Sequence, residues 1–135
     1  MQMPAEAIGF GVTIEDDFDS VLTSVVEALK VEGFGVLTEI DVQATLKKKI
    51  DVDFRRYQIL GACNPPLAYK ALNAQPSVGL MLPCNVTVAE NDNGDVEVSF
   101  VDPLLLMTFF GNRELESIAM EAKERLQRVA AALEE

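Results

Sequence analysis

An amphipathic pattern near the start of the chain does most to limit the possible folds. Large apolar residues recur there at helical spacing over three turns: Phe18, Val21, Leu22, Val25, Val26 and Leu29. Asp16 or Asp17 can cap the start of this helix, and Gly33 stands where the helix should end. The pattern predicts a long helix near 17–31 that must bury its apolar face against another layer.

Shorter apolar segments with alternating polar residues predict strands around this helix. The sequence Asn91-Asp-Asn-Gly94 predicts a hairpin turn between two of them, with the glycine at a position that needs positive φ. Pro83 should bend or break the fourth extended segment, because proline cannot donate to a strand ladder. The predicted strands and extended segments span 7–14, 35–40, 57–62, 78–90 and 96–100.

Further helices are predicted where a capping residue precedes an apolar stripe. Asp41 precedes a short basic helix over 42–49, whose buried stripe should be Val42, Leu46 and Ile50 just beyond it. Asn64 precedes a short helix that should begin at Pro65 and end before Pro76, and Pro103 opens an apolar helical turn. Asn112 precedes the last long helix, with a core face of Leu115, Ile118, Ala119, Ala122, Leu126, Val129, Ala130 and Leu133.

The order of these elements predicts an α+β domain. The 135 residues suit one domain spanning 1–135, and neither a linker nor a repeat interrupts it. Strands and helices mix irregularly, with a clear hairpin late in the chain. We therefore expect a mainly antiparallel sheet with long helices covering one face.

The composition excludes several classes of function. The formal net charge is −11, which argues against a nucleic-acid partner, because such proteins neutralise phosphates with Lys and Arg. The densest apolar run, 104–107, is far shorter than the ~20 residues that span a bilayer, so no membrane partner is predicted. The first six residues show no pattern of a signal peptide. A cytoplasmic protein with reduced thiols and no structural disulfide is expected.

Three stretches of the chain resemble the bacterial and archaeal family called domain of unknown function 302. They are GFGVLTEIDVQATLK at 33–47, YQILGACNPP at 57–66 and GLMLPCNV at 79–86, and the likeness extends over about 21–107. The resemblance implies a fold of the TATA-binding-protein-like type, a curved antiparallel sheet packed against helices, often as a homodimer. It implies no established activity, and the name of the fold does not imply DNA binding.

The candidate site residues come from two Cys-Asn steps that use both cysteines of the chain, Cys63-Asn64 and Cys84-Asn85. Each step follows an apolar run. Because the chain has no histidine, these thiols are the side chains most easily made nucleophilic near neutral pH. Asn64 has a structural explanation as a helix cap, whereas asparagine is disfavoured in a strand, so Asn85 is the better candidate for lining a polar pocket. A bend after Pro83 that uses the Asn85 amide is the alternative.

The two cysteines leave three interpretations open. They can simply pack, because free cysteine is among the most buried residue types. A pair of thiols, Cys63 and Cys84, can also bind a soft ion such as Cu(I), form a reversible disulfide or handle a sulfur species. The third interpretation is a site in which the side chains of Asn64 and Asn85 matter more than the thiols. Two ligands are too few for a structural zinc site, and Pro65 and Pro66 remove N–H donors that favour a thiolate at a helix start.

The leading functional hypothesis is a small dimeric module that binds an unknown small molecule or ion near the Cys-Asn steps. A thiol protein acting through Cys63 and Cys84 is the first alternative, and an enzyme with a carboxylate base is the second. No cofactor is predicted, since no phosphate loop or dinucleotide fingerprint occurs. The segment 104–110 holds six large apolar side chains and one threonine, so we expect a homodimer that uses this surface. The basic segment 47–56 and the acidic stretch before Lys30 could orient the pairing.

Overall fold

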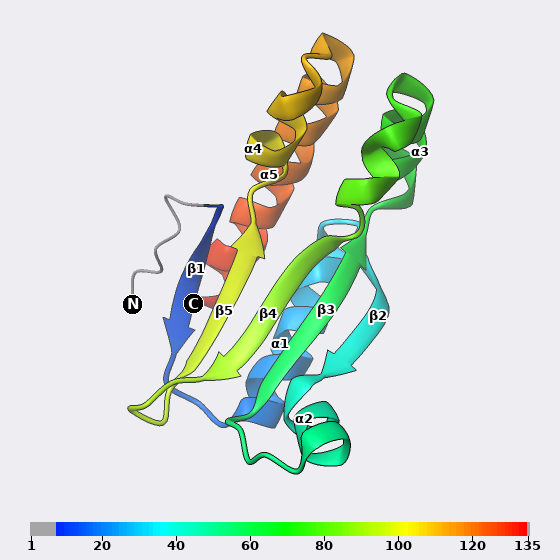
Figure 1. The fold of residues 1–135 in the computed structure, drawn as a ribbon. Helices are drawn as coiled ribbons and strands as arrows, with labels where there is room; N and C mark the ends of the chain where they lie inside the picture. The colour runs from blue at the N-terminus through cyan, green and yellow to red at the C-terminus, as the bar shows by residue number, and fades with distance from the viewer. Residues whose placement is uncertain (1–7, 135) are drawn as a thin grey trace.

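Five strands form one sheet in the order β1-β5-β4-β3-β2, and every neighbouring pair is antiparallel (Figure 1). The computed structural model describes residues 8–134, so the start of the predicted first strand at Ala7 and the residues examined for a signal peptide lie outside the described residues. The strands are β1 (Gly9–Ile14), β2 (Gly35–Asp41), β3 (Tyr57–Cys63), β4 (Cys84–Glu90) and β5 (Val96–Val101).

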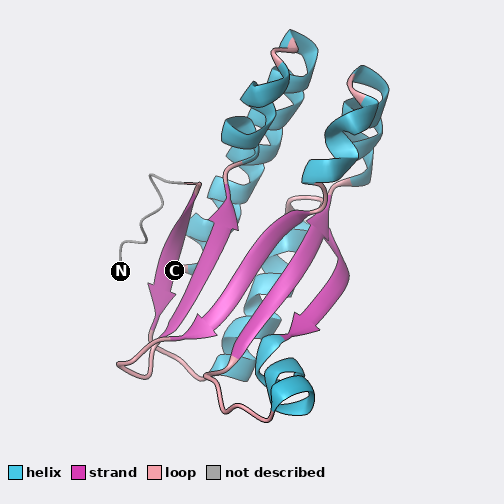
Figure 2. Cartoon of the chain, viewed as in Figure 1, coloured by secondary structure: helices cyan, strands magenta, loops and turns pink. Residues whose placement is uncertain are grey.

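Two long helices cover one face of the sheet, which confirms the α+β class (Figure 2). The helices are α1 (Phe18–Val31), α2 (Val42–Ile50), α3 (Pro65–Ala74), α4 (Pro103–Met107) and α5 (Arg113–Leu133), with 3₁₀ helices η1 (Pro76–Met81) and η2 (Thr108–Phe110). The main core joins α1 and α5 to the covered face of the sheet. Its fully enclosed side chains include Val25, Leu29, Leu60, Val86, Val88, Val98 and Leu126.

The capping residues act as the sequence predicts. The carboxylate of Asp17 accepts from the Ser20 amide at 3.0 Å, and Gly33 follows the helix with φ 86°. Asp41 accepts from the amide of Ala44 at 2.9 Å at the start of α2. Each cap satisfies an amide that has no partner inside the helix, and so fixes where the helix begins.

The predicted hairpin and its alternating strands are also confirmed. Gly94 has φ 83° in the turn between β4 and β5. Val88 pairs with Val98 in the register and both are fully buried against the helices, whereas Thr87 and its partner Ser99 lie on the other face and are half-buried. Successive side chains of a strand point to opposite faces, so this register leaves the second face of the sheet without a helical layer.

Two local predictions are wrong. The segment 78–90 is extended only from Cys84 onward, because 76–81 forms η1 and buries Val78 among the neighbouring helices rather than in the sheet. The preceding Pro83 has no amide for the ladder, which explains why pairing starts at Cys84. Ile50 is 63 % exposed instead of buried, since α2 lies at the end of the sheet and no second layer covers it.

Two groups of helices extend beyond the ends of β3 and β5 (Figure 1). The first arm consists of α3 and η1, and the second arm consists of α4, η2 and residues 113–122 of α5. The side-chain amide of Asn112 caps α5 through the Leu115 amide at 3.1 Å and donates to the carbonyl oxygen of Ala74 at 3.0 Å. The two arms are therefore joined where α3 ends and α5 begins. Within residues 8–134, no helix has both the length and the hydropathy of a membrane span.

Candidate functional site

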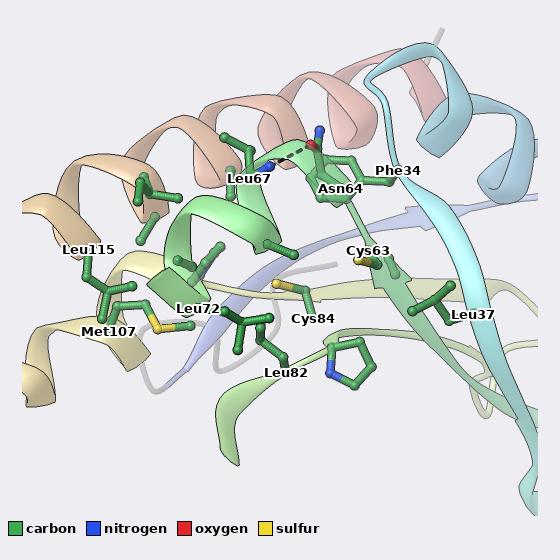
Figure 3. Close-up of a pocket in the computed structure, with 18 residues that line it drawn as sticks. Phe34, Leu37, Cys63, Asn64, Leu67, Leu72, Leu82, Cys84, Met107 and Leu115 are labelled. Atoms are coloured by element: carbon green, nitrogen blue, oxygen red, sulfur yellow. Dashed lines mark hydrogen bonds between the residues drawn. The ribbon is translucent and has the colours of Figure 1, made fainter. Parts of the chain in front are cut away.

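A cavity of about 290 Å³ lies between the two arms and the ends of β3 and β4 (Figure 3). We call it the arm cavity. It is lined by Phe34, Leu37, Ala62, Cys63, Asn64, Leu67, Ala68, Ala71, Leu72, Leu82, Pro83, Cys84, Pro103, Met107, Leu115, Ile118, Ala119 and Ala122. Three of the four residues predicted from the Cys-Asn steps are therefore in one place.

Asn64 holds the chain at the junction between β3 and the first arm. Its side-chain oxygen accepts from the amide of Leu67 at 3.2 Å, as expected of a helix cap. Its side-chain nitrogen donates to the carbonyl oxygen of Glu32 at 3.4 Å, and the same oxygen accepts from Nη1 of Arg125 at 3.0 Å. Asn64 is buried and both ends of its amide are engaged, so it positions the wall of the cavity.

The two thiols come together because their strands are neighbours. Cys84 opens β4 opposite Ala62, the residue before Cys63 in β3. Both cysteines are free thiols that line the arm cavity. Burial raises the pKa of the Cys63 thiol, and burial together with the nearby Cys63 raises the pKa of the Cys84 thiol to about 11. Both groups are therefore neutral at pH 7 and are weak nucleophiles.

Asn85 lies outside the arm cavity. It is the residue after Cys84 in β4, so its side chain points to the opposite face of the sheet, where it pairs with Gly61 and is exposed. Gly61 is required there, since a Cβ at that position would overlap the side chains of Thr38 and Pro83. The structure thus separates the two asparagines that the sequence places in equivalent steps.

The space in the arm cavity comes from small side chains that the sequence analysis did not treat as a site. Ala68 and Ala71 of α3 and Ala119 and Ala122 of α5 line it from two helices. Alanine at spacing of three residues on both helices is a signal for such a gap, but the same pattern also suits close helix packing. Met107, which is buried, closes the cavity on the side of the second arm.

The lining offers little to a metal ion. Among residues 8–134, no group of three or more Cys, Asp, Glu or His side chains has the geometry to hold one. Cys63 and Cys84 would also have to lose their protons to bind a soft ion, and burial opposes that loss. The arrangement favours a site that receives an uncharged group.

Comparisons with known proteins agree with this architecture. The family model Domain of unknown function DUF302 matches residues 10–133. The chain is 30 % identical to a protein of known crystal structure, the uncharacterized conserved protein DUF302 from Bacillus stearothermophilus, over 92 % of this chain and 96 % of that one, with a TM-score of 0.85. No match was found among curated proteins. The matched residues include both arms and, apart from Gly9, all five strands, and the chain therefore belongs to the DUF302 family.

Proposed function

We propose that this chain is a small homodimeric binding module whose ligand occupies the arm cavity. The observation that carries the proposal is the cavity itself, about 290 Å³ in volume and placed where both cysteines meet. The cavity opens to solvent beside the exposed Leu37 and Leu72. A mainly apolar concave site of this kind is the usual form of a small-molecule site.

The alternative of a carboxylate-base enzyme receives no support from this site. No acidic side chain is among the described residues that line the arm cavity. Next to the lining residue Pro103, Asp102 pairs with Lys123, Nζ to Oδ2 at 3.0 Å, and so links α5 to the start of α4. The Asp102 carboxylate also caps α4 through the amides of Leu104 and Leu105. Its bonds give it a structural role beside the cavity.

Binding can be tested with a neutral fluorescent probe such as 1-aminoanthracene. We expect the wild-type protein to bind it in the arm cavity with an increase in fluorescence, and Ala119→Leu to abolish this binding because the new side chain occupies the space. Val31→Ser is the matched control, because Val31 is 82 % exposed, does not line the cavity and lies outside the two arms. Equal binding by wild type and Ala119→Leu would place the probe outside the cavity and contradict the proposal.

The homodimer is proposed from apolar side chains left exposed on the arms. Phe109 of the second arm is 79 % exposed and Leu80 of the first is 88 % exposed. Of the segment 104–110, Met107 is buried inside the monomer, whereas Leu105 remains exposed with Phe109. Exposed side chains of this size favour association.

Charge also favours the first arm, with α4 and η2 of the second, as the contact surface. The segments 54–89 and 103–113, which include these elements, contain no acidic residue, whereas the α5 part of the second arm carries Glu114, Glu116 and Glu121. Two copies of a chain with net charge −11 repel least where acids are fewest. The basic segment contributes less than its composition implies, because Arg55 pairs with Asp92 and Arg56 with Asp19, each at 2.9 Å within the same chain.

Sedimentation of wild type and two lysine variants tests the dimer and its surface. We expect wild type to sediment as a dimer at micromolar concentration and Phe109→Lys to sediment as a monomer, because the new charge would be desolvated in the interface. Lysine lowers the net negative charge, so general repulsion would not explain the loss. Val31→Lys, at another exposed apolar residue, is the control and should remain dimeric. If the wild-type protein sediments as a monomer, the proposed homodimer is wrong. If Phe109→Lys sediments as a dimer, Phe109 does not lie in the interface and the proposed contact surface is wrong.

A further inference from the structure

We infer that the ligand of the arm cavity is a flexible saturated hydrocarbon chain of about ten carbons, attached to a polar end that stays in water. This inference rests on the proposed function and narrows it to one class of ligand.

The lining excludes ligands that need a charge or a strong hydrogen bond inside the cavity. None of the described lining residues carries a charge, and the amide of Asn64 is already engaged at both ends. The remaining polar groups are the thiols of Cys63 and Cys84, which are protonated and are weak hydrogen-bond partners. A buried carboxylate, phosphate or ammonium would find no partner there and would be unstable.

The side chains favour an aliphatic rather than an aromatic ligand. Phe34 is the one aromatic residue among those that line the cavity, whereas leucine, isoleucine, methionine, proline and alanine form the rest of its apolar wall. Aromatic ligands gain from stacking on other rings, which a single phenylalanine hardly provides. Met107 is flexible and polarizable, and such a side chain adapts to a chain with several conformers.

The volume sets the length of the chain. A 150 Å³ apolar cavity is sufficient for benzene, so a cavity of about 290 Å³ accommodates on the order of ten carbon atoms. The lining residues of α5 run from Leu115 to Ala122, which corresponds to about 10 Å along the helix at 1.5 Å per residue. A chain of about ten carbons fits this length when it is partly folded.

The mouth is identified by the lining residues that reach solvent. Leu37 is 67 % exposed and Leu72 is 43 % exposed, whereas Leu115, Met107 and Ala119 are buried. Leu37 sits in the bulge between Val36 and Thr38 on the edge strand β2, and Leu72 lies on α3. Figure 3 shows these two leucines on opposite sides of the thiols. A hydrocarbon chain that enters between Leu37 and Leu72 would place its methyl end near the second arm and its polar group in solvent.

Calorimetric titration with 1-alkanols of six to fourteen carbons tests the inference. We expect the affinity of the wild-type protein to rise about fourfold for each added methylene and to stop rising near ten carbons, where the cavity is full. Ala71→Leu narrows the cavity at a buried position, so the affinity should stop rising two or three carbons earlier. Val31→Ser, which leaves the lining unchanged and lies outside the two arms, should retain the wild-type limit.

The polar end is tested separately at constant chain length. Decanol, decanoate and decyltrimethylammonium should bind within about tenfold of one another, less than the loss from removing two methylenes, about 15-fold. If one of the three ligands binds much more tightly than the others, the protein recognises that head group, whether alcohol, carboxylate or ammonium. Such a result would overturn the claim that the head group lies in water. Binding that ignores chain length, or a limit unchanged by Ala71→Leu, would overturn the hydrocarbon assignment.

These outcomes are distinguishable from a failure of the proposed function. If 1-aminoanthracene binds the wild-type cavity and no alkanol does, the site exists and the hydrocarbon assignment is wrong. If neither the probe nor any alkanol binds, the arm cavity is not a ligand site and both proposals fail.

Discussion

The sheet core and the two arms differ in how completely they fill space. Between the sheet and helices α1 and α5, side chains such as Leu29, Leu60 and Leu126 have no exposed surface, and the layer is closed. Between the arms, Met107 and Leu115 are equally buried, yet they line a cavity of about 290 Å³. Long helices on a sheet can align continuous apolar faces, whereas two short α-helices, two 3₁₀ helices and several alanines leave a gap between them. The sheet core thus stabilises the fold, whereas the arms provide space for a ligand.

The largest expected effect is from truncating the filled core. Leu126→Ala should lower the free energy of unfolding by about 3 kcal/mol, because a fully enclosed leucine leaves a new cavity. Met107→Ala should cost less, about 1 to 2 kcal/mol, since one side of Met107 already faces open space. Chemical denaturation of both variants measures the two values. Equal losses would show that the arms are packed as tightly as the core.

The second prediction concerns pH and the thiol at the boundary of the two regions. The pKa of Cys84 is about 11 in the folded chain and about 9 when exposed, so the unfolded state loses its proton first as pH rises. The contribution of the neutral thiol is therefore complete below pH 9 and should decline by about 2 to 3 kcal/mol between pH 9 and 11. Denaturation curves of wild type and Cys84→Ala over this range isolate the effect, because lysines and tyrosines titrate in both. If the free energies of unfolding of wild type and Cys84→Ala change in parallel between pH 9 and 11, this prediction is wrong.

The third prediction compares the same substitution in both regions. Ala130→Leu adds carbons to the closed core and should cost about 1 to 3 kcal/mol. Ala71→Leu adds them beside the arm cavity and should raise the free energy of unfolding by about 0.5 to 1 kcal/mol, since space is available. Thermal and chemical denaturation should show that Ala130→Leu lowers the free energy of unfolding and that Ala71→Leu raises it. A loss of stability in Ala71→Leu similar to that of Ala130→Leu would mean that the cavity is not open to a side chain.

The smallest difference between the two regions is expected at their helix caps. Asn64→Ala should cost about 1 to 2 kcal/mol, because it removes the cap of α3 and leaves buried groups without a partner. Asp41→Ala removes an exposed cap of α2, which water can replace, and should cost about 0.5 to 1 kcal/mol. The difference between the two variants measures how much the junction of sheet and arm depends on Asn64.

The contrast between the regions also explains which features were predictable from the sequence. Periodic apolar residues with a cap, as in 17–31 and 112–133, predict a helix and its buried face together, and both are confirmed. Apolar and polar residues alternate in the two strands that flank Gly94, and this local pattern likewise predicts both the hairpin and its buried face. The TATA-binding-protein-like type of fold stays a prediction.

The arm region was less predictable because its structure depends on contacts distant in the sequence. The apolar run at 78–82 has the composition of a strand, but Val78 finds its partners on α3, α4 and α5. The meeting of Cys63 and Cys84 follows from the pairing of Ala62 with Cys84, which no local pattern specifies. Asn64 was predicted as a cap and is one, whereas Asn85 turned to the opposite face by the alternation of its strand.

The position of β1 at the edge of the sheet has a consequence for folding during synthesis. Strands β2 to β5 pair with neighbours that follow closely in the sequence, but Gly9 pairs with Val101 and Ile14 with Val96. At about 5 to 20 residues per second, a ribosome needs roughly 5 to 20 s to make the partner of β1 after β1 itself. Of the five strands of the sheet, β1 waits longest for its partner, and its docking on β5 completes the sheet.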